Sequence, residues 1–81
     1  MQIKQAVNIL AAVARQCNNA GVLLEPDFDS DLDTLIFRLT FGRYKRDVMI
    51  SLYEIESYRM PPEEYVASRI DVVIWELKNA R

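Results

Sequence analysis

The strongest constraint on the fold is a strict alternation of apolar and polar residues in the middle of the chain. Between Thr34 and Phe41 every second residue is large and apolar: Leu35, Phe37, Leu39 and Phe41. Beyond Gly42 the same parity continues at Val48, Ile50 and Leu52. A period of two is typical of a strand with one buried face, so this region predicts a β-hairpin.

The turn of this hairpin can be built in two ways. If Gly42 and Arg43 form a two-residue turn with glycine first, Arg38 pairs with Asp47 across the strands. A four-residue loop would instead pair Leu39 with Val48. Both registers keep the same residues on the same face, so the predicted core does not depend on the choice. The opposite face is unusually apolar for a solvated surface, with Ile36, Met49, Tyr53 and Ile55.

A helix is predicted on each side of the hairpin. The first spans Gln2 to Ala20, where apolar residues recur every three or four positions: Ile3, Ala6, Val7, Leu10, Val13, Ala14 and Cys17. The last begins at Pro61 and Pro62, because proline suits the first turn of a helix. Its apolar stripe is Val66, Ile70, Val73 and Leu77.

Between the first helix and the hairpin, Val22 to Leu24 predicts a short strand that Pro26 confines to a sheet edge. Asp27 to Asp33 has aspartate at every second position and is predicted to be a loop. Residues 1–81 are therefore expected to form one α+β domain of order αβββα, an antiparallel meander sheet with two helices packed on one face.

Composition excludes several classes of function. The chain has no histidine and one cysteine, so it lacks the commonest metal ligand and general base, and no disulfide can form within it. The longest stretch without a charge, Gln5 to Ala14, is too short to cross a bilayer. We therefore expect a non-enzymatic cytoplasmic protein that needs no cofactor, in a bacterial cell or a phage-infected host cell.

A formal net charge of −2 conceals two oppositely charged segments. Residues 25–33 hold five acids and no base: Glu25, Asp27, Asp29, Asp31 and Asp33. Read as an EF-hand loop from Asp27, this run would place Leu32 and Arg38 where that motif requires Gly and Glu, so no metal site is predicted. We instead expect these acids to steer a basic protein partner.

The hairpin tip carries the opposite charge. Arg43, Lys45 and Arg46 surround Tyr44, a pattern of cations and an aromatic ring that is typical of nucleic-acid contacts. This favours a nucleic-acid-binding domain as the alternative function, although the acidic total charge makes that partner less expected.

A third candidate surface is aromatic. Tyrosine and tryptophan are enriched at interface hot spots, so partner contacts are predicted at Tyr53, Tyr65, Val72 and Trp75. Burial of the last three in a homodimer would also stabilise a small domain. A structural subunit of an obligate homo-oligomer is therefore a further alternative.

The helix, three strands and helix resemble the double-stranded-RNA-binding domain in their order. That family opens its last helix with a lysine-rich motif that grips phosphates, whereas this chain has Pro61, Pro62, Glu63 and Glu64 there, so no RNA-binding residue carries over. The order and acidic character also look like some phage-encoded anti-CRISPR proteins. This resemblance implies an inhibitor that occupies a nucleic-acid site on a host complex, with carboxylates in place of phosphates.

Overall fold

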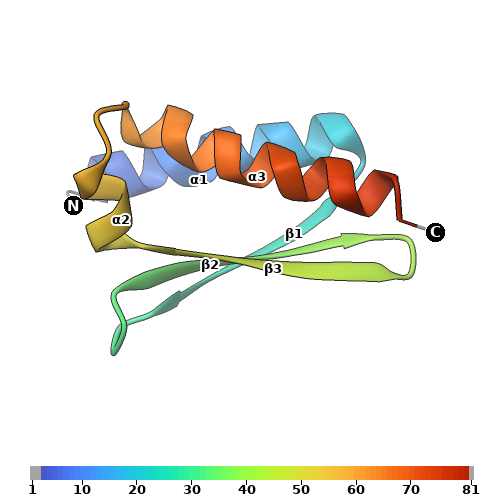
Figure 1. Cartoon of the computed structure of the whole chain (residues 1–81), viewed down its shortest axis with the longest axis horizontal. Helices are drawn as coiled ribbons and strands as arrows, with labels where there is room; N and C mark the ends of the chain where they lie inside the picture. Colours follow the sequence, from blue (N-terminus) through green and yellow to red (C-terminus); the bar gives the residue numbers. More distant parts are fainter. Residues whose placement is uncertain (1–2, 81) are drawn as a thin grey trace.

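Figure 1 shows the computed structural model, which describes residues 3–80. The elements are α1 (Ile3–Ala20), β1 (Leu23–Asp29), β2 (Thr34–Phe41), β3 (Tyr44–Ser51), α2 (Leu52–Ser57) and α3 (Pro62–Lys78). The predicted α+β class and αβββα order are confirmed, with α2 added before α3. Gln2, the expected start of the first helix, lies outside the described residues. No helix within residues 3–80 combines the length and apolarity needed to cross a bilayer.

The three strands form one antiparallel sheet in the order β1-β2-β3. Phe41 lies opposite Tyr44 and Arg38 lies opposite Asp47, so the hairpin uses the two-residue turn. Gly42 has a φ of 60°, a left-handed conformation that glycine adopts without steric cost at the first central position of such a turn. Of the two predicted registers, the one with glycine first in the turn is confirmed.

β1 corrects the prediction of a short strand followed by a loop. It runs through Pro26 to Asp29, with Glu25 opposite Arg38 and Asp27 opposite Ile36. Pro26 is tolerated because β1 is an edge strand, as expected. Next to it, the Phe28 backbone N–H donates to Asp27 Oδ1 at 2.8 Å. Cross-strand pairing with β2 has thus overridden the weak strand preference of aspartate.

α1 and α3 cover one face of the sheet, and the other face is open (Figure 1). The apolar side chains predicted to share one face of the sheet form its part of the core: Leu35, Phe37, Leu39, Val48 and Ile50 are all buried. α1 is rotated relative to the predicted stripe. It buries Ile9, Val13 and Cys17, whereas Ile3, Val7, Leu10 and Ala14 are exposed on its flank.

α2 replaces the end of the second predicted strand. Ser51 caps this helix by accepting a hydrogen bond from the Glu54 backbone N–H at 3.0 Å. The Ser-x-x-Glu spacing of Ser51 and Glu54 is the sequence signal for such a cap, and it competes with the alternation that extends the strand. As a result, Tyr53 and Ile55 do not lie on the open face of the sheet, and Ile55 is part of the core.

Candidate functional site

The turn between β1 and β2 is the part of the sheet that projects farthest from the two long helices (Figure 1). We call residues 27–33 the acidic turn. It contains the last residues of β1 and the four-residue turn that leads into β2 at Thr34. Four of its seven residues are aspartates, so side-chain carboxylates dominate its surface.

Side chains inside the acidic turn fix its shape. Asp29 Oδ1 accepts hydrogen bonds from the backbone N–H groups of Asp31, at 3.0 Å, and Leu32, at 3.3 Å. The Thr34 hydroxyl donates to the Leu32 carbonyl at 2.9 Å. These bonds satisfy backbone groups that would otherwise depend on water, so the turn is held in one conformation before any partner arrives.

α2 supports the same turn from behind. Asp33 has a φ of 45°, a left-handed conformation that aspartate tolerates better than most residues. Its carbonyl accepts a hydrogen bond from the Leu52 backbone N–H, the first residue of α2, at 2.8 Å. The acidic turn is therefore attached to the rest of the fold at both ends.

Two large apolar side chains stand among these acids. Phe28 is 45% exposed and Leu32 is 62% exposed. Neither was predicted as a site residue, because residues 27–33 were interpreted as a uniformly polar loop. The available signal was the pair of apolar residues that interrupt the aspartates.

The acids are ordered along β1 rather than gathered into a pocket. Glu25, Asp27 and Asp29 share the open face of the strand, where alternate residues lie about 6.7 Å apart. Arg38 of β2 lies among them, with its Nη1 3.5 Å from Asp27 Oδ2. This pair is about half exposed, so it adds little stability. Within residues 3–80, no three His, Cys, Asp or Glu side chains are grouped so that they could hold a metal ion.

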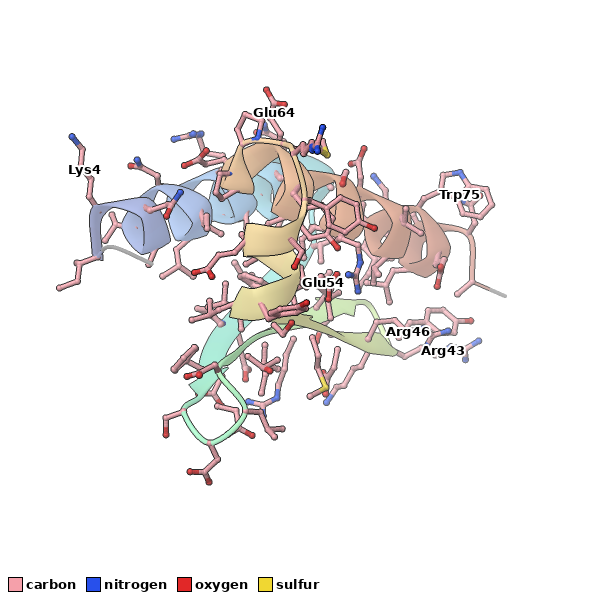
Figure 2. The ribbon with its side chains drawn as sticks, turned by 60° about the vertical axis from the view of Figure 1, so that its left-hand side comes forward. Lys4, Arg43, Arg46, Glu54, Glu64 and Trp75 are labelled. Atoms are coloured by element: carbon pink, nitrogen blue, oxygen red, sulfur yellow. The ribbon has the colours of Figure 1, made fainter. Side chains whose placement is uncertain are left out.

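The predicted basic residues lie at the other end of the sheet. Arg43, Lys45 and Arg46 are exposed around the two-residue turn. The end of α3 adds a fourth cation that the sequence did not associate with them, since Lys78 Nζ lies 5.9 Å from the centre of the Phe41 ring. Figure 2 shows Arg43 and Arg46 at the same end of the molecule as Trp75.

The predicted aromatic surface is divided among separate places. Val72 and Trp75 are exposed on the outer side of α3, beside a shallow hollow that Ser68 and Asp71 also line. Tyr53 is exposed on α2, a helix that lies beside the start of α3, at the other end from Trp75 (Figure 1). The expectation that Tyr65 belongs to an exposed surface is corrected, because its side chain is buried in the core.

Tyr65 has a structural role between α2 and α3. Its hydroxyl donates to Glu54 Oε2, Arg69 Nη1 donates to the same carboxylate oxygen, and the Tyr58 ring stacks on the Tyr65 ring at 4.3 Å between centroids. Burial, and then the bond to Glu54, raise the pKa of Tyr65. Burial likewise raises the pKa of Cys17, which packs in the core as a small apolar residue.

Comparison with models of known protein families, with curated proteins and with solved structures finds no match. Any functional proposal therefore rests on the chemistry of these surfaces alone.

Proposed function

We propose that this protein is a non-enzymatic binding module that docks onto a basic surface of another protein through its acidic turn. The observation that carries the proposal is the exposure of Phe28 and Leu32 in the same short segment as Asp27, Asp29, Asp31 and Asp33. Phe28 lies on the face of β1 opposite to Asp27 and Asp29, so the apolar and acidic side chains flank the edge of the strand. An apolar centre with a polar, solvent-accessible rim is the usual anatomy of a protein interface.

The two kinds of side chain have different tasks in this proposal. The carboxylates attract a basic partner over several ångströms and increase the rate of encounter. Phe28 and Leu32 then bury apolar area at the contact, at roughly 25 cal/mol per Å². Because Asp29 already fixes the turn, binding costs little additional conformational entropy.

The same strand supports a narrower proposal, an inhibitor of a host nucleic-acid-processing complex of the CRISPR type. Carboxylates at Glu25, Asp27 and Asp29 repeat about every 6.7 Å along one face of an edge strand. This spacing resembles that of the phosphates along a nucleic-acid strand, although Arg38 offsets the charge of the middle carboxylate, Asp27. In this version the protein acts in the cytoplasm of the host cell and competes with the nucleic acid for its site.

The proposal is tested by using the tagged wild type and its tagged variants to capture proteins from a lysate of the source organism. Quantitative mass spectrometry then compares the amount of each protein that the variants and the wild type retain. Leu32→Ser should remove the partner, and Asp31→Lys should weaken its capture most strongly at low salt. Two matched controls should retain it: Val7→Ser removes an exposed apolar side chain on α1, and Glu64→Lys makes the same charge change on α3. Capture that is insensitive to Leu32→Ser and Asp31→Lys would refute docking through the acidic turn.

Competition separates the narrower proposal from the general one. If the carboxylates replace phosphates, an oligonucleotide should release the captured partner in proportion to its concentration. If salt releases the partner but the oligonucleotide does not, docking through the acidic turn is retained and the phosphate-mimic version is excluded.

A further inference from the structure

The basic end of the sheet is formed by two elements that are distant in sequence. We define it as Arg43, Lys45 and Arg46 of the hairpin and Lys78 of α3. All four are exposed. Lys78 Nζ lies 5.9 Å from the centre of the Phe41 ring, so the last turn of α3 lies beside the tip of the hairpin.

These cations differ from two arginines elsewhere in the fold. Arg38 and Arg69 are paired with Asp27 and Glu54. None of the four cations of the basic end forms an ion pair with an acid among residues 3–80. Their charge is therefore available to a ligand.

The acidic total charge does not cancel this local field. The acidic turn lies at the opposite end of β2, about 23 Å away along the strand. At physiological ionic strength the Debye length is about 8 Å, so nearly three screening lengths separate the two charged ends. A polyanion that approaches the basic end therefore meets its four cations and the exposed acids Asp47 and Glu76 of the same two elements, while the acidic turn is largely screened.

Aromatic rings accompany the cations at this end. Trp75 is 66% exposed and precedes Lys78 by one helical turn. On the hairpin, Tyr44 is half-buried, with the Arg43 guanidinium 5.3 Å from its ring centre. An exposed ring beside cations that have no acidic partner among residues 3–80 suits a ligand that carries both phosphates and unstacked bases, because a base can stack on the ring.

We propose that the basic end binds single-stranded nucleic acid, with Arg43, Lys45, Arg46 and Lys78 along the phosphates and Trp75 against a base. Lys45 shares the open face of the sheet with Asp47, whereas Arg46 has the parity of the helix-covered face. The cations thus surround the tip of the hairpin. They can contact successive phosphates of a nucleic-acid strand that passes across this tip. This site is independent of the acidic turn, and either proposal can fail without the other.

The test is fluorescence anisotropy of labelled 15-nucleotide dT and U oligomers, titrated with the protein at several salt concentrations. Binding should weaken as salt rises, with a slope of log Kobs against log salt of about −2 to −3, as expected for three or four phosphate contacts. Trp75 is the only tryptophan, so its fluorescence should change in the same titration.

Charge reversal locates the site. Arg43→Glu with Arg46→Glu should lower the affinity at least tenfold at low salt and reduce the slope by about 1.4. Lys4→Glu with Arg15→Glu on α1 gives the same total charge and should change the affinity less than twofold. Thermal melting of each variant verifies that it is folded.

Three outcomes would overturn the proposal. One is absence of binding at low salt with tens of micromolar protein. Another is an equal loss of affinity in the two charge-reversed variants. The third combines two results: duplex DNA binds as tightly as the single strands, and Trp75→Ala does not change the affinity for either. That outcome would indicate a general contact with polyanions instead of recognition of unstacked bases.

Discussion

The acidic turn and the two-residue turn at Gly42 lie at opposite ends of the same sheet and are built differently. The acidic turn is held by side chains, through Asp29, Thr34 and the bond from Leu52 of α2. The turn at Gly42 is set by backbone conformation, with one glycine at a φ of 60°. The first exposes apolar side chains among acids, and the second exposes cations beside aromatic rings.

The difference teaches how a chain of small net charge can carry two strongly charged surfaces. Cross-strand pairing brings Arg38 into contact with Asp27 in the middle of the sheet, where the two charges offset each other. The acidic turn and the basic end lie beyond opposite ends of β2, in a molecule that is 37 Å long. Four predictions test this contrast, from the largest expected effect to the smallest.

The largest effect is expected behind the acidic turn, where α2 is anchored to α3. Glu54→Ala removes the acceptor for the Tyr65 hydroxyl and the Arg69 guanidinium, and should lower the free energy of unfolding by about 2 kcal/mol. Urea denaturation measures this. Glu64→Ala, at an exposed position that precedes Tyr65 but takes no part in its bonds with Glu54 and Arg69, should stay within about 0.5 kcal/mol of the wild type. An equal loss there would contradict the assigned role of Glu54.

Within the acidic turn, Asp29→Ala should lower the free energy of unfolding by about 1 to 1.5 kcal/mol, because the backbone N–H groups of Asp31 and Leu32 lose their acceptor. Hydrogen exchange at these two amides should accelerate while exchange at β3 amides stays slow. Asp29→Asn retains an acceptor oxygen and should recover most of the protection. If the amides exchange no faster in Asp29→Ala, the turn is not held by this side chain.

At the other end of the sheet, Gly42→Ala should lower the free energy of unfolding by about 1 kcal/mol, because alanine is strained at the positive φ of this position. Apart from Gly42 and its two chain neighbours, no atom lies within 4 Å of where the added Cβ would sit, so contact with the rest of the fold adds nothing. Gly42→Asn should cost less, because asparagine adopts positive φ more readily. Thermal melting compares the variants, and equal costs for alanine and asparagine would argue against a conformational origin.

The smallest effect is a dependence on alkaline pH. Since the pKa of Tyr65 is raised in the folded state, the folded protein holds this proton more tightly than the unfolded chain. Stability from this group is present below the ordinary tyrosine pKa of 10.0 and is lost as pH rises through the raised value. The urea midpoint of the wild type should therefore fall more steeply above pH 10 than that of Tyr65→Phe. Parallel curves would contradict the linkage.

Particular residues show where sequence reasoning succeeds and where it fails. The hairpin was predictable because alternation marks both strands and Gly42 marks the turn, but the sequence left two registers open and the structure selects the one that pairs Arg38 with Asp47. The edge strand β1 was predicted only over Val22 to Leu24, because its continuation through Asp27 to Asp29 depends on pairing with β2 and not on local preference. α1 has apolar residues on two adjacent faces, and only packing against α3 and the sheet decides that Ile9 is buried and Val7 is not.

The candidate surfaces divide in the same way. Charge segregation is visible in the sequence, so the acidic and basic segments could be distinguished before their positions in space were known. The addition of Lys78 to the basic end depends on how α3 lies against the hairpin. Burial of Tyr65 depends on Glu54 and Arg69, which only the fold brings to it.

The central claim is that the acidic turn, and not the basic end, holds the protein partner. Its most direct test is the affinity of the purified partner for two variants, Leu32→Ser and the double variant Arg43→Glu with Arg46→Glu, measured by calorimetry against the wild type. We predict that Leu32→Ser loses at least tenfold in affinity, as expected for an apolar anchor, and that the double variant loses less than twofold. A larger loss in the double variant, or an unchanged affinity in Leu32→Ser, would contradict the claim.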